Sequence, residues 1–194
     1  MKHKILFTAL IAGACTFQAC QNANKTSNDP DSLTTGLVDS ANQAMEDTAG
    51  INNNDTANFI TQAAIGGKME VELGNLAQKQ AASAAVKEFG ALMVKDHSKA
   101  NTELKMIAGT KKVDLPDGFP AAIQSHIDSM KNMKGADFDK HYMTMMVQDH
   151  VKDIALFKAA TGNSDADISG FAKKTLPVLE THHQKATAIQ KSLK

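Results

Sequence analysis

Apolar side chains recur at steps of three and four residues along most of this chain, and nowhere do they alternate in the two-residue pattern of a strand. The first long stretch begins at about Asp55, its expected N-cap, and ends at about Gln80. Its expected inner face comprises Phe59, Ala63, Gly66, Glu70, Leu73 and Ala77. This spacing predicts an amphipathic helix that must bury one face against other helices.

The same pattern predicts three further long helices and one short helix. The long ones cover about residues 83–112, 136–160 and 165–193, and the short one covers about residues 120–133. Ser164 or Asp165 is the expected N-cap of the last helix, and Pro177 is expected to interrupt it. Helices of matched length with short or medium connections form antiparallel bundles. We therefore predict an all-α fold, an antiparallel four-helix bundle with an extra short helix between the second and third long helices.

Composition limits the kinds of partner that the chain can bind. A length of 194 residues with 42% hydrophobic content supports one domain with flanking segments. The 21 basic residues are all lysine and are balanced by 21 acidic residues, so the net charge is zero. Without arginine there is no bidentate guanidinium for phosphate or guanine, and Trp is absent. We expect no nucleic-acid partner.

The N-terminal residues have the pattern of an export signal. A short basic segment, residues 1–4, precedes an apolar run at residues 5–17 that is too short to span a bilayer. The following Gln18-Ala19-Cys20 resembles the end of a bacterial lipoprotein signal, in which the cysteine carries the lipid anchor. Cys15 is a competing processing site, and an ordinary cleaved signal is the alternative reading. With Cys20 as the anchor, the mature chain has no second thiol for a disulfide or a Cys-based zinc site.

This reading divides the chain into three parts. Residues 1–20 form the signal, residues 21–55 form a polar, flexible tether, and residues 56–194 form the helical domain. We expect the protein in the bacterial cell envelope, in the periplasm or at the outer membrane, attached to the membrane through its lipid anchor.

A repeated phrase, Met-Val-x-Asp-His, places histidines in the predicted interior. It occurs at residues 93–97 and 146–150, so His97 and His150 each occupy a position of the apolar face. Glu70 occupies such a position on the first helix. On the last helix the apolar face passes through His183, but the adjacent His182 leaves the inward residue of the pair open. Glu180 lies three residues before His183, a spacing that puts both on one side of a helix.

These residues could hold a metal ion, with iron, zinc and copper as the candidate elements. Bundles that bind two ions use inward carboxylates with Glu-x-x-His on two helices. Here Val94 and Val147 occupy the positions three before His97 and His150, so that pattern is incomplete. A single ion held by two or three histidines and Glu70 fits better. The alternative is a metal-free polar cluster in which the histidines hydrogen-bond to Glu70 or to backbone carbonyls.

Asp96 and Asp153 are assigned to solvated flanks of their helices. Asp149 would have to rotate inward before it could bridge two ions.

Several separate stretches resemble, in order, the bacterial family called domain of unknown function 4142. They are residues 63–74, 93–97, 135–143, 149–150 and 175–179, followed by His182. The resemblance covers about residues 55–193 and implies a ferritin-like bundle in an exported protein, of a kind often labelled an outer-membrane protein. It implies no established activity. By motif position, Glu70, His97, His150 and His182 match the polar residues that recur in this family.

Three functions follow from these features. The primary interpretation is an envelope-located, lipid-anchored binding or stress-related module without catalysis. The second is a metal-binding or metal-storing ferritin-like protein whose candidate ligands are Glu70, His97, His150, Glu180, His182 and His183. The third is a metal-dependent oxidoreductase. The sequence identifies no protein partner and no oligomeric state.

Overall fold

The computed structural model describes residues 56–193, so the expected signal, tether and Asp55 cap lie outside the described residues. It contains the long helices α2 (Thr56–Gln80), α3 (Ala84–Lys111), α5 (Gly135–Ala160) and α6 (Ala166–Ser192), and the short helix α4 (Ala121–Lys131). These residues form helices and no strand, which confirms the all-α prediction. Across residues 56–193, none of the helices combines the length and apolarity needed to cross a membrane.

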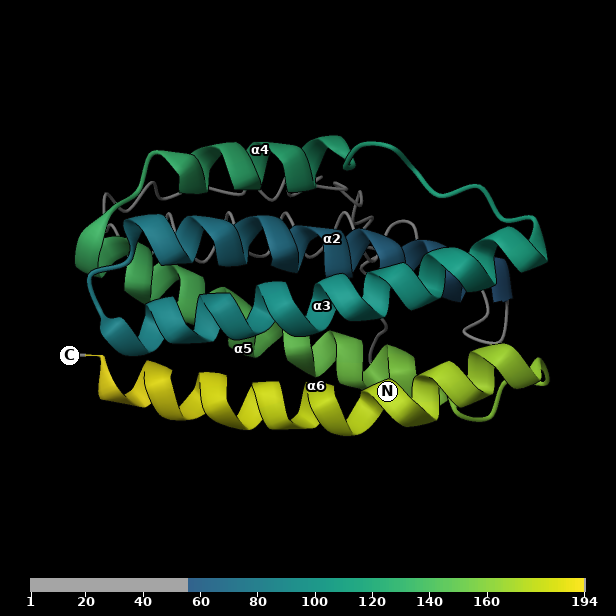
Figure 1. Cartoon of the computed structure of the whole chain (residues 1–194). Coiled ribbons are helices and arrows are strands. Elements are labelled where there is room, and N and C mark those ends of the chain that lie inside the picture. The colour runs from purple at the N-terminus through teal and green to yellow at the C-terminus, as the bar shows by residue number, and fades with distance from the viewer. Residues whose placement is uncertain (1–55, 194) are drawn as a thin grey trace, which may run out of the picture.

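The four long helices surround a shared interior (Figure 1). α2 packs along α3 and α5 packs along α6, while further contacts join α2 to α5 and α3 to α6. The short helix α4 lies against α2, outside the long helices (Figure 1). Helices that follow one another in the chain run in opposite directions (Figure 1). The result is a helical bundle with one interior.

The helix ends agree closely with their sequence signals. The side chain of Asp165 accepts hydrogen bonds from the backbone N–H groups of Asp167 and Ile168, so it is the N-cap of α6. Lys112 ends α3 in the left-handed conformation, with φ 56°. Pro177 lies inside α6 but does not end it, since helix continues on both sides. Because proline has no N–H, the expected loss of the hydrogen bond to the Lys173 carbonyl occurs within a continuous helix.

Two glycines allow α2 and α3 to approach closely. A Cβ atom built on Gly74 would lie 2.7 Å from the carbonyl oxygen of Gly90. A Cβ atom on Gly90 would lie 2.7 Å from the Cβ atom of Ala77. Either side chain would force the two backbones apart, so the absence of side chains here sets the spacing of these helices.

The interior has two apolar cores, and the buried His97, His150 and His182 lie between them along their helices. One core lies toward the Gln80 end of α2 and includes Leu73, Phe89, Met93, Phe138, Tyr142 and Met146. The other lies toward the Thr56 end and includes Phe59, Ile60, Leu104, Phe157, Phe171 and Leu179. In sequence, His97 falls between the α3 residues of the two cores, and His150 does the same on α5. The apolar cores therefore hold a polar layer away from both ends of the bundle.

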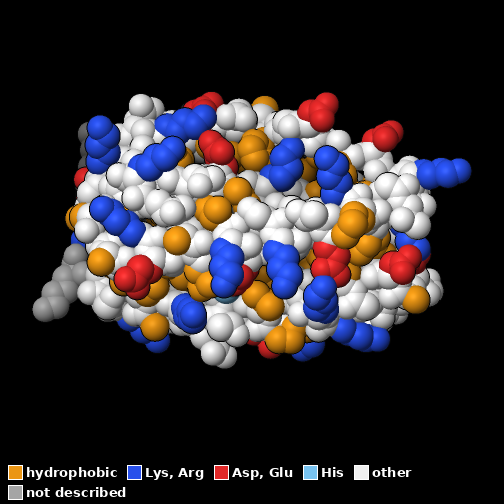
Figure 2. All heavy atoms as spheres, in the orientation of Figure 1, with side chains coloured by type: hydrophobic (Ala, Val, Ile, Leu, Met, Phe, Trp, Pro, Cys, Tyr) orange, Lys and Arg blue, Asp and Glu red, His pale blue; other side chains and the backbone are white. Residues whose placement is uncertain are grey.

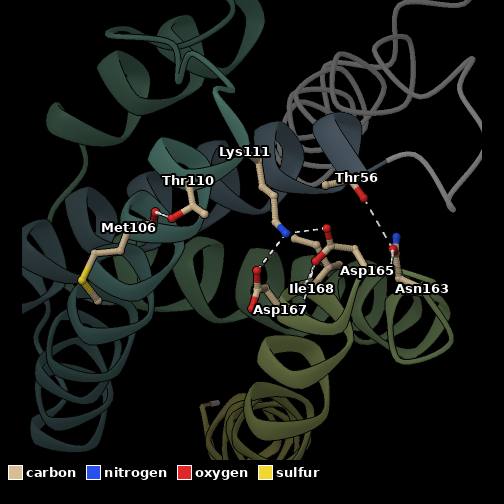
Figure 3. A network of polar contacts seen from close by, with 8 residues as sticks. All are labelled: Thr56, Met106, Thr110, Lys111, Asn163, Asp165, Asp167 and Ile168. Carbon is tan, nitrogen blue, oxygen red and sulfur yellow. Dashed lines mark hydrogen bonds and ion pairs between the residues drawn. The ribbon is translucent and has the colours of Figure 1, made fainter.

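Polar contacts join the ends of helices at the Thr56 end of the bundle (Figure 3). The Lys111 ammonium group, in the last turn of α3, lies 2.5 Å from Asp165 and 2.8 Å from Asp167, at the start of α6. The Thr56 hydroxyl donates to the side-chain oxygen of Asn163 at 3.4 Å. These contacts connect the starts of α2 and α6 to neighbouring helix ends.

A buried carboxylate joins helices at the opposite end. Asp139 of α5 is 3% exposed and accepts hydrogen bonds from the backbone N–H groups of Ala82 at 3.1 Å and Ser83 at 2.8 Å. These two residues lie immediately before α3, where backbone N–H groups lack helical partners and a negative charge is favourable. Asp139 thus takes the capping role that the Ser83 side chain does not perform.

Candidate metal centre

Glu70 lies at the centre of the polar layer and is 1% exposed. His97 Nδ1 on α3 lies 2.8 Å from its Oε2 atom. His150 Nδ1 on α5 lies 3.4 Å from its Oε1 atom, and only 2.9 Å from the carbonyl oxygen of Met146. We therefore assign the Nδ1 proton of His150 to the Met146 carbonyl. The expected meeting of His97 and His150 around Glu70 is observed.

The fourth helix contributes His182, which is 1% exposed. Its Nε2 atom lies 2.9 Å from the Oδ2 atom of Asp96 on α3. His183 is only half-buried and Glu180 is exposed, so the structure does not bring these two candidates into the site. The inner face of α6 passes through Leu179, His182 and Ala186, at steps of three and then four. The face predicted from the sequence passes through Leu179, His183 and Ala186, at steps of four and then three. Helical geometry allows both orders equally.

The rings of His97, His150 and His182 converge. Their ring centroids are 5.8 Å apart for His97 and His150, and 5.4 Å apart for each of the other two pairs. One potential ligand atom from each ring lies within 4.8 Å of the other two. Tetrahedral ligands at about 2.1 Å from zinc are about 3.4 Å apart, so a bound ion would draw the rings inward. Within residues 56–193, no other group of three or more histidine, cysteine or carboxylate side chains converges in this way.

Each of these imidazoles has one engaged nitrogen and one without a hydrogen-bond partner. The engaged nitrogens face Glu70, the Met146 carbonyl and Asp96. The buried nitrogens without a partner are Nε2 of His97, Nε2 of His150 and Nδ1 of His182. Metal-bound histidines typically donate their second N–H to a carboxylate or a backbone carbonyl, which orients the ring and fixes the tautomer. All three histidines have that arrangement.

Burial and charge set the protonation of the centre. Burial alone would raise the pKa of Glu70, but the neighbouring His97 and His150 lower it overall. Burial opposes the charged form of His97, yet Glu70 raises the His97 pKa above its ordinary value. Burial lowers the pKa of His150 to about 4 and also lowers that of His182. His150 is therefore neutral near pH 7, the form that binds metal ions.

Two further buried carboxyl groups lie on α5 beside this centre. Burial, followed by the nearby Glu70 charge, raises the pKa of Asp149 to about 8 and that of Asp153 well above its ordinary value. Neither oxygen of Asp149 has a hydrogen-bond partner. The assignment of Asp153 to a solvated flank is wrong, since it is 8% exposed. α5 contacts both α2 and α6, so it buries a wider arc than one apolar row implies.

The role of Asp96 is not apparent from the sequence, which predicts a place on a solvated flank. Its side chain is 27% exposed, but its carboxylate accepts a hydrogen bond from the buried His182. The only sequence signal is that an aspartate directly precedes the histidine in both copies of the repeated phrase, Asp96 in one and Asp149 in the other. The pairing itself connects two helices far apart in the chain, which no spacing within one helix reveals.

A separate pair of buried histidines lies between α4 and α5. The rings of His126 and His141 stack with centroids 5.1 Å apart and planes at 25°. Burial lowers the pKa of His141. Neither residue belongs to the converging group of three.

The comparisons with known proteins yield one family. The family model described as "Domain of unknown function (DUF4142)" matches residues 40–189. Searches of curated proteins and of solved structures found no match to this chain.

Proposed function

Since this chain belongs to the DUF4142 family, whose description assigns no activity, we propose a function from its own buried site: it binds one transition-metal ion through His97, His150 and His182. The observation that carries the proposal is the convergence of three imidazoles, each with one nitrogen engaged and one buried nitrogen without a partner. A buried polar atom left unpaired costs about 1–3 kcal/mol. A bound ion would engage all three nitrogens at once.

Glu70 and Asp96 would orient the ligands without binding the ion. Glu70 faces His97 Nδ1 at 2.8 Å, and Asp96 faces His182 Nε2 at 2.9 Å. Three imidazole ligands suit zinc, iron(II) and copper, and they leave a fourth position open. The ligand set is therefore smaller than the sequence proposal, because Glu180 and His183 lie away from the centre.

Metal analysis of the full chain, made without a polyhistidine tag, tests this function. After incubation with Zn²⁺, Fe²⁺ or Cu²⁺ and removal of excess ion, we expect one equivalent to remain. We also expect an increase in stability, about 2.7 kcal/mol at a free-ion concentration 100 times Kd. His182→Ala should abolish stoichiometric binding, whereas His183→Ala should retain it because His183 is outside the cluster. Less than about one-tenth of an equivalent in the wild type would instead support the metal-free polar cluster.

We also propose that the described helices form a ferritin-like antiparallel four-helix bundle carried by an envelope lipoprotein. The contacts that join the four long helices around one interior support the bundle. The apolar run at residues 5–17 and the following Cys20 support export and lipid anchoring. In this proposal a polar tether, residues 21–55, holds a metal-binding module at the membrane surface.

Cysteine substitutions test the anchor. Cys20→Ser should prevent incorporation of labelled fatty acid and move the protein from the membrane fraction to the soluble envelope fraction. Cys15→Ser is the matched control and should leave both properties unchanged. The opposite result would identify Cys15 as the processing site, and no effect from either change would leave an ordinary cleaved signal.

A metal-dependent oxidoreductase is the alternative that Asp149 favours. This carboxyl group is 4% exposed and both of its oxygens lack a hydrogen-bond partner. Two metal equivalents in the wild type, reduced to one in Asp149→Asn, would support a two-metal centre. A single equivalent in both proteins favours the three-histidine site.

A further inference from the structure

Of the three groups that hold the histidines of the proposed metal centre, the Asp96 carboxylate reaches solvent. The Glu70 carboxylate and the Met146 carbonyl belong to buried residues, whereas the Asp96 side chain is 27% exposed. Its Oδ2 atom lies 2.9 Å from Nε2 of His182, which is itself buried. The two apolar cores occupy both directions along the bundle from these histidines. The Asp96–His182 hydrogen bond is therefore a direct contact between a solvent-exposed group and a proposed ligand of the ion.

Asp96 is also part of the wall of a groove between α3 and α6. The groove has a volume of about 140 Å³, and its wall includes Asp96, Lys99 and Glu103 of α3 with Lys174 and Val178 of α6. At about 30 Å³ of liquid volume for each water molecule, the groove has room for about four or five of them. An ion that keeps part of its hydration shell can therefore enter the groove and meet the Asp96 carboxylate.

The charges of the groove make Asp96 its group for receiving a cation. The Lys174 ammonium group lies 2.6 Å from the Glu103 carboxylate, so these two charges compensate each other. Lys99 is exposed and opposes a general attraction of the groove for cations. Figure 2 shows lysine and carboxylate side chains interspersed over the face formed by α3 and α6, which favours capture at one carboxylate over attraction to a whole face. A carboxylate oxygen is a ligand for divalent ions, and the Asp96 carboxylate is the one in this groove that contacts a buried histidine.

From these features we infer that the metal ion enters and leaves the three-histidine site through the α3–α6 groove, where Asp96 receives it and His182 turns to admit it. The inference rests on the proposed function, because it needs an ion bound by His97, His150 and His182. An ion at Asp96 competes for the carboxylate that holds the His182 ring, which frees this imidazole to turn about its own side-chain bonds. His97 and His150 are held by other, buried groups and stay in place. Asp96 thus contacts the ion only in passage and orients His182 once the ion is bound.

Stopped-flow kinetics of the full chain, made without a polyhistidine tag, test this route. The visible absorption of bound Co²⁺ gives the rate constant of entry, and release into excess chelator gives the rate constant of exit. Val178→Trp places a large side chain over the groove at an exposed position of α6. We expect both rate constants to fall by the same factor of about ten, equivalent to a barrier raised by about 1.4 kcal/mol, with an unchanged Kd. Equal slowing of entry and exit is the signature of a blocked route, because Val178 is not a ligand.

Two further variants complete the experiment. Val151→Trp is the matched control, since Val151 is exposed on α5 and does not line the groove, and it should leave both rate constants unchanged. Asp96→Asn tests the receiving carboxylate, because the amide oxygen can still accept from His182 but the negative charge is lost. Entry should slow about tenfold in this variant. Asp96→Asn also serves if Val178→Trp does not fold.

The two proposals fail in different ways. Stoichiometric Co²⁺ with entry rates unchanged in both Val178→Trp and Asp96→Asn would overturn the route and leave the metal site intact. Slowing in only one of these variants would overturn the role of the residue whose variant is unaffected. Equal slowing in Val151→Trp would show that entry depends on a general opening of the bundle, and would also overturn the route. Absence of stoichiometric Co²⁺ from the wild type would overturn both proposals.

Discussion

Removing the Asp96 carboxylate should weaken metal binding without unfolding the protein. This carboxylate accepts from His182 Nε2 at 2.9 Å, and the imidazole is 1% exposed, so Asp96 orients one of the three proposed ligands. Loss of an outer hydrogen-bond partner of a metal ligand typically costs about 10–100-fold in affinity. Asp96 is itself 27% exposed, so water can partly replace it in Asp96→Ala. We therefore expect an increase in Kd near the lower end, about tenfold, or about 1.4 kcal/mol.

Asp96→Ala should reduce the free energy of unfolding by less than the loss of a fully buried hydrogen-bond partner of His182 would. Water entering at the Asp96 position can accept from His182, so we expect a loss of about 1 kcal/mol in the free energy of unfolding of the metal-free protein. Competition between the protein and a chelator of known affinity measures Kd, and urea unfolding measures stability. Both are recorded at one pH and one ionic strength.

Glu103→Ala is the matched control for Asp96→Ala. Glu103 lies on α3, as Asp96 does, and both residues line a surface groove between α3 and α6. The Glu103 carboxylate, however, pairs with the exposed Lys174 and not with a histidine. Such a surface pair contributes about 0–1 kcal/mol, and its loss should leave Kd unchanged. An unchanged Kd in Asp96→Ala, or an equal increase in both variants, would refute the orienting role of Asp96.

Three further predictions concern stability, each measured by chemical unfolding. Asp139→Ala should cost about 1–3 kcal/mol, because it leaves two backbone N–H groups before α3 without their acceptor, while the exposed Asp137→Ala should cost much less. Gly90→Ala should cost about 1–3 kcal/mol through the forced contact with α2, whereas Gly109→Ala, with no neighbour within 4 Å, should stabilise by up to about 1 kcal/mol. Burial lowers the pKa of His141, so its contribution to stability is fully present above the unfolded value of about 6.5 and is lost as pH falls through the lower folded value. His141→Gln should reduce the acid-side slope of stability against pH; an unchanged slope would contradict this assignment.

Local patterns in the sequence determine the helices and most of their inner faces. A helix with three- and four-residue apolar steps has one buried stripe whatever its neighbours are, so Glu70, His97 and His150 could be placed in the interior from their position in that stripe. The Asp165 cap was predictable for the same reason, since its hydrogen bonds run to residues two and three positions away. These features depend on interactions within a few residues.

Contacts between helices decided the rest of the centre. Steps of three then four, or four then three, both continue a helical face, so only packing against α3 and α5 determines that His182, and not His183, turns inward. Asp96 acquires its partner from α6, and Asp153 is buried because α5 has neighbours on two sides. Periodicity gives the angle of a side chain around its own helix axis. It does not say which other helix occupies that angle, and that is the information from which a shared site is built.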